Sequence, residues 1–527
     1  MILTAADTRD ALHALQRGRR VRRLHDLDWI EVAYKAYIAA ILSLGTLFTS
    51  AAIVGDTPLK PGTVDQLRDN GPAIVGLVIA VAIMLGLRSG ARGGPLALEP
   101  ADVNHILLAP ADRAVVLRAS AYRQLRGVAM VGLVGGALAG LLVAQRVPDV
   151  TGSDVAGWIA AGVGTGGAAV VAVWGSALVA SGRRWSRLLT GAIGVALVAW
   201  SLLDVFAGVI TSPASMLGSL ALWPLDVRPL AVVGVLIALA IPVIGMVGIG
   251  GTSIEAAERR SGLVGALRFA ATIQDLRTVI VLHRQLAQER SRPTPWVRLP
   301  ARKPVGHAAW RRDWQGILRW PLSRVGRVAA LGAVAGLCAY GTWEGTTPLI
   351  IVAGIALFIA ALDAIEPLAQ EVDHPDRTQG VPIKRGEMYV RHLAVPVVVM
   401  ALAGLIGLGA AAVLDPEPGL FVVGLITVVP VAFAAAAAAA FAVVLGAPKL
   451  TSGLTLSFPE AATIGLILRQ AFPPFLAALA IAPVIAAREA VHQHGDPIAI
   501  AALAAIPALV IAAAVVAFLR SRKSVVF

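Results

Sequence analysis

The sequence predicts an all-α integral membrane protein with about 12 transmembrane helices, arranged as two six-helix halves. Three observations support this fold class. The 527 residues are 57% hydrophobic and only 15% charged, whereas a soluble protein would carry about 25% charged residues. Twelve apolar blocks are each long enough to cross a bilayer core of about 30 Å. A charged segment after the second block recurs in the second half of the chain.

The twelve apolar blocks give the predicted spans in chain order. They lie near 33–54, 71–87, 128–144, 155–180, 188–210, 229–251, 327–343, 346–366, 393–414, 420–446, 473–487 and 498–519. The eleventh is short and contains proline, which makes it the weakest of the predicted spans.

A basic, apolar-striped segment precedes the first span. Residues 5–31 carry five arginines between positions 17 and 23, a pattern typical of a helix that lies in the headgroup layer. A simple basic anchor is the alternative. Residues 310–327 precede the seventh span in the same way, and Asp313–Trp314 there echoes Asp28–Trp29.

The distribution of basic residues predicts the orientation. With the N-terminus inside, the outward loops hold only five of the 45 Lys and Arg residues: Lys60, Arg68, Arg146, Arg228 and Arg488. Cytoplasmic loops normally carry this excess, so we expect a multi-pass protein of a bacterial plasma membrane with both termini cytoplasmic. The same bias, together with anionic membrane lipids as partners, accounts for the net charge of +13 without nucleic acid.

The charged segment Pro95–Arg118 recurs as Pro367–Val390 with an offset of 272 residues. Without any gap, six residues match: Pro95, Leu96, Ala97, Glu99, Pro110 and Arg113 fall on Pro367, Leu368, Ala369, Glu371, Pro382 and Arg385. A fixed offset near half the chain length predicts internal duplication.

Three regions follow from this duplication. We expect a first membrane half at 1–260, a cytosolic linker at 261–309 and a second membrane half at 310–527. Within the linker, the apolar residues between Phe269 and Ile280 form one helical stripe, which predicts an amphipathic helix. Prolines at 293, 295, 300 and 304 then interrupt helical structure.

The segment between the fifth and sixth spans, TSPASMLGSLALWPLDVRP, is apolar but too short to cross a membrane. We predict a re-entrant or interfacial helix on the outer face over 211–228. The second half has only REAVHQHGDP at the matching place, so we expect the two halves to differ there.

Motifs for catalysis and metal binding are absent from the sequence. No GxxxxGK[ST] loop is present to hold a triphosphate, and GxSxG, HExxH and CxxC do not occur either. The single cysteine, Cys338, excludes an internal disulfide, and the first 25 residues lack the pattern of a cleavable signal peptide. His492 and His494 lie close together, but ordinary loop residues explain them better than a metal site.

Ionisable residues inside spans are candidates for function in a membrane protein. Asp204, in the fifth span, is the clearest candidate for the substrate pathway, although a carboxylate hydrogen-bonded to a neighbouring helix explains it equally well. Asp363 and Glu366 lie near the inner end of the eighth span, and Glu344 lies at an outer edge.

The whole chain resembles the permease subunits of ABC-2-type (type V) ABC exporters, in the fused two-half, actinobacterial-type form. The resemblance covers elbow-like helices (5–31 and 310–326), coupling-helix-like segments (99–118 and 371–391) and the outer re-entrant piece. The wording LEPADVNHILLAPADRAVVLR and ATIQDLRTVIVLHRQLAQE is similar to that of such permeases.

The resemblance implies a non-enzymatic transport subunit that works as one pseudo-dimeric permease chain and exports an amphipathic or lipid-like solute. ATP and Mg²⁺ would bind to a separate ABC ATPase partner on the cytosolic face, and this chain would hold no cofactor or metal. Charged residues of the coupling-like segments would contact that ATPase: Glu99, Asp102, Arg113, Arg118, Glu371, Arg377, Arg385 and Arg391.

Two other function classes remain as alternatives. A 12-helix ion-coupled secondary transporter also has two halves and a central loop, but its short Asp-Arg-Gly-Arg-type signature is absent here. A membrane enzyme acting on a lipid-linked sugar would need an acidic site. The first outer loop offers Asp56, Asp65 and Asp69 without an adjacent pair.

Overall fold

The computed structural model describes residues 58–59, 61–91, 94–96, 98, 103, 112–182, 187–253, 255, 258, 261–263, 266, 282, 291–299, 308–374, 383–414, 418–445 and 471–521. The predicted span 33–54, the basic segment 5–31 and the whole amphipathic stripe of the linker lie outside these residues. The chain divides into two compact units, unit 1 (Met1–Arg268) and unit 2 (Phe269–Phe527).

The described residues form helices and no strand. Ten of these helices are long and apolar enough to cross a membrane, or up to eleven when the bent pair α14–α15 is taken as one span. Eleven of the twelve predicted blocks fall on these helices, and the first block lies outside the described residues. The chain is therefore an all-α protein with the character of a multi-pass membrane protein.

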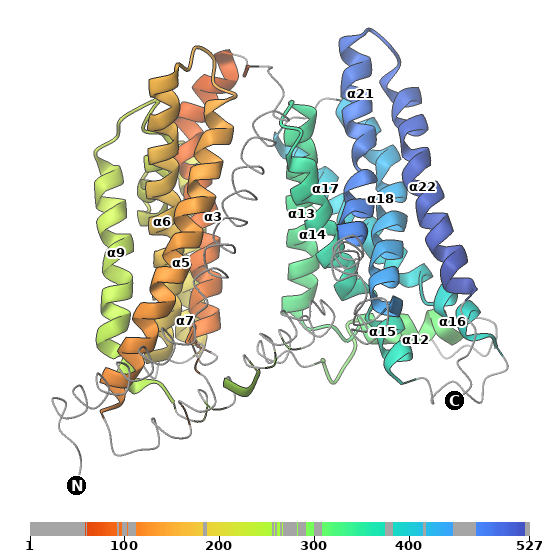
Figure 1. The fold of residues 1–527 in the computed structure, drawn as a ribbon, viewed down its shortest axis with the longest axis horizontal. Coiled ribbons are helices and arrows are strands. Elements are labelled where there is room, and N and C mark those ends of the chain that lie inside the picture. The colour runs from red at the N-terminus through yellow and green to blue at the C-terminus, as the bar shows by residue number, and fades with distance from the viewer. Residues whose placement is uncertain are drawn as a thin grey trace, which may run out of the picture. The chain divides into compact units, whose positions relative to one another are not determined.

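Five long helices build the described part of unit 1, and they run side by side in Figure 1. They are α3 (Pro61–Gly90), α5 (Arg113–Ala144), α6 (Gly152–Gly182), α7 (Arg187–Ala207) and α9 (Leu230–Gly248), the last continued by the 3₁₀ turn η3 (Ile249–Gly251). Helix α6 is central because it packs against α3, α5 and α9.

Glycine allows α5 and α6 to approach each other closely. A Cβ atom placed on Gly136 would lie 2.1 Å from the carbonyl oxygen of Gly162, and one on Gly140 would lie 2.2 Å from that of Trp158. Lipid provides no hydrophobic force between helices, so close backbone packing of small residues stabilises the pair.

The predicted short helix between the fifth and sixth spans is α8 (Pro213–Gly218), continued by η2 (Ser219–Leu222). It packs against α3 and α9, and Ser215 and Leu217 are almost completely buried. A Cβ atom on Gly76 of α3 would lie 2.3 Å from the Cα of Ser215. The segment is therefore inserted among the spans of unit 1, as a re-entrant helix would be.

Unit 2 contains the second set of long helices. They are α13 (Leu322–Trp343), α14 (Leu349–Ala364), α17 (Ala394–Leu414), α18 (Pro418–Leu445), α21 (Ala482–His492, the second part of the candidate span Ala471–His492) and α22 (Pro497–Arg520). Three short helices complete the described part of unit 2: α12 (Ala308–Ile317), α15 (Glu366–Asp373) and α16 (Arg385–Arg391).

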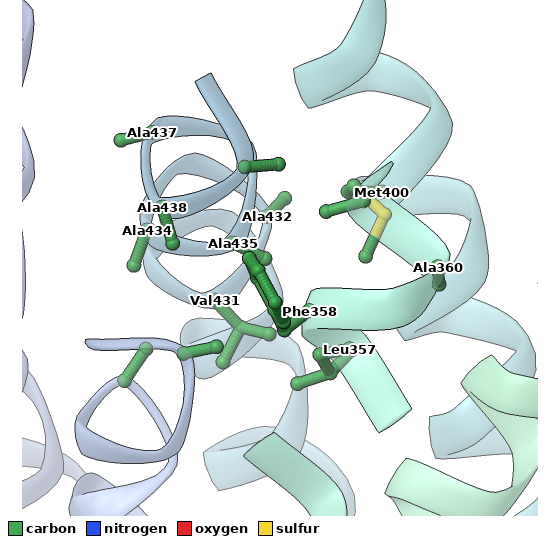
Figure 2. Packing of buried hydrophobic residues seen from close by; sticks show 14 of the residues in the cluster. Leu357, Phe358, Ala360, Met400, Val431, Ala432, Ala434, Ala435, Ala437 and Ala438 are labelled. Carbon is green, nitrogen blue, oxygen red and sulfur yellow. The ribbon is translucent and has the colours of Figure 1, made fainter. Parts of the chain in front are cut away.

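An alanine run in α18 forms the centre of the unit 2 core. The seven alanines from 434 to 440 are each at most 1% exposed. Figure 2 shows Phe358 of α14 and Met400 of α17 beside this helix. Small side chains bring the α18 backbone close to its neighbours, as expected for helices that pack in lipid.

Candidate functional site

The candidate site is the set of short charged helices α12, α15 and α16 of unit 2. Two of them continue directly from spans: α15 follows α14 at a bend of 58°, and α16 leads into α17 within three residues. Pro367 is tolerated at the start of α15 because the first helical turn needs no N–H donor there. Any displacement of α15 or α16 therefore acts on a span.

A buried pair joins α12 to the end of α16. The Nδ1 atom of His392 lies 2.8 Å from both carboxylate oxygens of Asp313, and each residue is 1% exposed. Burial raises the pKa of Asp313, although the hydrogen bond from His392 opposes this shift. The contact fixes α12 to His392, the C-cap residue of α16, just before α17 begins.

Two arginines of α13 hold the bend between α14 and α15. Arg327 binds the carboxylate of Asp363 in a bidentate manner, with Nε–Oδ2 and Nη2–Oδ1 distances of 2.7 and 3.1 Å. Arg324 donates to the backbone carbonyl of Asp363, forms an ion pair with Glu366 and stacks 4.2 Å above the ring centre of Trp320. Bidentate pairs of this kind are geometrically specific, so the bend is fixed to α13.

Glu371, one of the predicted ATPase contacts, is buried. It is 3% exposed, and its carboxylate lies 3.4 Å from the guanidinium of Arg312, whose side chain is 45% exposed. Glu371 therefore links α15 to α12. Arg312 is the member of this pair that reaches solvent.

The predicted contacts Arg385 and Arg391 are the first and last residues of α16. Arg385 is half-buried, whereas Arg391 is exposed and forms an ion pair with Glu387 at 2.8 Å. Between them, a Cβ atom on Gly386 would lie 2.2 Å from the carbonyl oxygen of Arg520, at the end of α22. Helix α16 thus carries an arginine at each end and packs closely against the end of α22.

In unit 1, Arg113 and Arg118 lie in the first turns of α5. Arg113 is exposed and follows the N-cap Asp112, which accepts a hydrogen bond from Ala114 N at 2.9 Å. The Nε atom of Arg118 donates to the carbonyl of Met246 in α9 at 3.1 Å. Glu99, Asp102 and Arg377 lie outside the described residues.

Two of the position pairs that match in sequence can be compared in the two units. Arg113 begins α5 and Arg385 begins α16, and each of these helices leads into a span. The matched leucines, Leu96 and Leu368, are both buried, at 4% and 0% exposed. Leu96 packs with Trp174 in the described core at this end of unit 1.

Asp204 is held by the entry to α8. Its carboxylate accepts hydrogen bonds from the backbone N–H of Ser212 at 2.8 Å and from the N–H and hydroxyl of Thr211. The residue is 1% exposed. This geometry favours the structural alternative, in which Asp204 anchors the segment that leads into the re-entrant helix.

The pairing of these groups could not be predicted from the sequence. Asp363 and Glu366 were expected near a span end, and Asp313–Trp314 echoes Asp28–Trp29, but nothing in the sequence indicated His392 or Arg324 as partners. Among the described residues, no group of three His, Cys, Asp or Glu side chains could hold a metal ion. Comparison of the chain with known protein families, curated proteins and solved structures gave no match.

Proposed function

We propose that this chain is the membrane-spanning permease subunit of an ABC transporter, and that it exports an amphipathic or lipid-like solute. A separate ATPase subunit on the cytosolic face binds and hydrolyses ATP. The chain itself is not an enzyme, and its role is to convert closure of the ATPase into movement of the spans.

The observation that carries this proposal is the way in which the charged helices are fixed to the spans. Asp313–His392 connects α12 to α16, Arg312–Glu371 connects α12 to α15, and Arg324 and Arg327 connect the α14–α15 bend to α13. Contacts to buried carboxyl groups such as Asp313, Asp363 and Glu371 resist separation, because breaking one leaves a buried polar group without its partner. A push on this surface would therefore reach several spans together.

Each unit has an exposed arginine that suits a protein partner. A partner shifts the equilibrium between two states only through contacts that differ between those states. Arg113 in unit 1 and Arg391 in unit 2 are exposed, and arginine forms strong charge-assisted contacts with carboxylates. Glu371 contributes indirectly, because it positions Arg312.

The ion-coupled secondary transporter is less well supported by the same geometry. Coupling to an ion gradient needs a carboxylate that exchanges its proton or ion during transport. Among the described spans, Asp204 is saturated with hydrogen bonds from Thr211 and Ser212, and Asp363 is paired with Arg327. These contacts favour fixed structural roles for both carboxylates.

The proposal is tested by purifying the tagged chain in mild detergent from its native host and identifying co-purifying proteins by mass spectrometry. We expect a stoichiometric ATPase with a Walker motif. The double variant Arg113→Glu, Arg385→Glu should lose it, because reversed charges repel the acidic groups that contacted arginine.

The matched control is Arg68→Glu, a charge reversal at an arginine with a side chain that is 46% exposed, near the start of α3 and on the outward side in the predicted topology. This variant should keep the ATPase. Purified wild-type protein that has no ATPase partner and still moves solute down a proton gradient would refute the proposal in favour of the secondary transporter.

A further inference from the structure

A pocket of about 640 Å³ lies in unit 1, at the end where α5 leads into α6. Its walls come from the α5–α6 loop (147–150), the first turns of α6 (153–161) and the segment around η2 (220–227). The volume falls within the range of about 300–1,000 Å³ that is typical of small-molecule sites. None of the residues that we propose to contact the ATPase lines this pocket.

Aromatic and proline side chains form the apolar part of the wall. Trp158 is 2% exposed and packs with Ala144 and Leu222 beneath the pocket, so it supports the wall from behind. Trp223 is half-buried, and its indole N–H donates to the carbonyl of Arg228 at 3.2 Å, which sets the direction of the ring. Pro148 and Pro224 complete this part of the lining.

The charged part of the wall is acidic. Asp149 and Asp154 line the pocket, and no basic residue does. Asp154 accepts two hydrogen bonds from Thr151, both at Oδ2, at 2.9 and 2.7 Å. Among the described residues, neither carboxylate has an ion-pair partner.

The N-terminus of α6 faces the same region and contributes the opposite sign of charge. A helix N-terminus is equivalent to about +0.5 elementary charge, and two carboxylates together contribute about −2. Both carboxylates are exposed, so solvent screens part of their charge, but its sign favours a cation over an anion.

We propose that this pocket binds an amphipathic organic cation, with a quaternary ammonium or phosphonium centre and apolar substituents. Trp223 would contact the cation through its ring face, as aromatic side chains do in sites for quaternary ammonium ligands. Asp149 and Asp154 supply the compensating charge. The proposal concerns binding alone, does not rest on the proposed function and goes beyond it.

Equilibrium dialysis of the full chain in lipid nanodiscs tests this proposal without ATP or a partner. The probes are tetraphenylphosphonium and tetraphenylborate, which share their shape and differ in the sign of charge. After subtraction of empty discs, we expect saturable binding of tetraphenylphosphonium, one per chain, and none of tetraphenylborate. Equal saturable binding of both ions, or no saturable binding of the cation, would overturn the proposal.

A glycine in the wall offers a way to fill the pocket without changing its charge. A Cβ atom on Gly157 would meet only Pro224, at 3.9 Å, so a larger side chain there enters the pocket. Gly157→Phe should weaken tetraphenylphosphonium binding at least about tenfold, roughly the loss of one good contact surface. Gly152→Phe is the matched control: it lies one turn earlier, in open space and outside the lining, and should bind normally.

The charge requirement is tested separately. Asp149→Asn should weaken cation binding about three- to fivefold, the effect of one partly exposed ion pair, and the double variant with Asp154→Asn should weaken it about tenfold. Asp226→Asn is the control, because Asp226 pairs with Arg228 at 2.7 Å and does not line the pocket. Unchanged binding in both Gly157→Phe and Asp149→Asn, with folding verified by gel filtration, would place the cation elsewhere and refute the proposal.

A lipid headgroup and a free solute could both supply a quaternary ammonium group. Dialysis in phosphatidylglycerol discs and in phosphatidylcholine discs distinguishes these sources. If the lipid headgroup is the ligand, tetraphenylphosphonium should bind more weakly in the choline lipid than in phosphatidylglycerol. This difference between the two lipids should disappear in Gly157→Phe. Equal binding in both lipids would identify a free cation.

Discussion

At the scale of single residues, the charged groups of this chain act mainly by holding elements in place. Asp313, Glu371 and Asp204 are each at most 3% exposed, and each has a specific partner. Taking such groups out of water is unfavourable unless the partner and its hydrogen bonds compensate. Their substitution should therefore affect stability before it affects any contact with another molecule.

The first prediction concerns the pH dependence of stability at Asp313. Burial raises the pKa of this carboxyl, so the folded state keeps its proton to a higher pH than the unfolded chain. The stability that this group contributes is greatest below the unfolded pKa of about 3.9 and is lost as the pH rises through the folded pKa. His392, Arg312 and Glu371 are the charged or titratable groups that act on it.

The variant Asp313→Asn has no carboxyl group to titrate at this position. Its melting temperature relative to wild type should therefore rise as the pH increases from about 4 and then level off above the folded pKa. Tryptophan fluorescence during thermal unfolding in detergent, between about pH 4 and pH 8, measures this difference. A difference that is constant across the range would contradict the prediction. Asp65→Asn, at a 70% exposed side chain, is the control and should show no such trend.

The second prediction concerns Asp204. Asp204→Ala would leave the N–H groups of Thr211 and of the buried Ser212 without their acceptor, and an unsatisfied buried donor costs about 1–3 kcal/mol. We expect the free energy of unfolding to fall by about 1–3 kcal/mol, with a smaller loss for Asp204→Asn. Denaturant titration followed by tryptophan fluorescence provides the measurement.

A transport assay shows whether Asp204 has a further role. If Asp204→Asn abolishes gradient-driven transport while stability stays within about 0.5 kcal/mol of wild type, the structural role is wrong and ion coupling is favoured. Asp65→Ala serves as the exposed control and should change neither quantity.

At the scale of elements, helix contacts in this chain depend on where glycine lies. Gly132, Gly136 and Gly140 are spaced four residues apart on α5, and a Cβ atom on any of them would lie within 2.6 Å of an α6 carbonyl oxygen. The neighbouring Gly135 faces open space. This pair of adjacent glycines, one in the contact and one outside it, allows a matched test.

The third prediction is that Gly136→Ala lowers the free energy of unfolding by about 1–3 kcal/mol, because the added methyl group forces α5 and α6 apart. Gly135→Ala adds the same methyl group without a clash and should be neutral or stabilising by up to about 1 kcal/mol through helix propensity. Unfolding titrations of the two variants decide this. Equal effects would show that helix propensity, and not packing, dominates at these positions.

At the scale of the whole molecule, the chain consists of two compact units with an internal offset of 272 residues. The predicted orientation places the α5–α6 loop outside and α12 inside. Gly152 and Gly316 lie at these two places, and a Cβ atom on either would meet nothing within 4 Å. Cysteine can therefore be introduced at both without disturbing the packing.

The fourth prediction is an accessibility pattern in a Cys338→Ala background, which removes the single native thiol. Gly152→Cys should react with a membrane-impermeant maleimide in intact cells. Gly316→Cys should react only after permeabilisation, because the bilayer blocks a charged reagent. The reverse pattern would invert the topology, and labelling of both in intact cells would place the two sites on one side.

The sequence by itself predicted the spans well because hydropathy is a local property. Eleven apolar blocks coincide with described helices, while helix ends were missed: the third block was expected from residue 128, and α5 begins at Arg113. Helix α5 extends that far because Asp112 caps its N-terminus. Nothing in the apolar pattern indicates where such a polar first turn begins.

The tertiary structure alone decided which groups meet. Asp313 and His392 are 79 residues apart in the chain, and Arg312 and Glu371 are 59 apart. A single sequence reveals the cost of burying such charges but not the partner that compensates for it, because pairing depends on how separate helices pack. The acidic pocket was hidden for the same reason: its walls come from three segments between residues 147 and 227 that only the fold brings together.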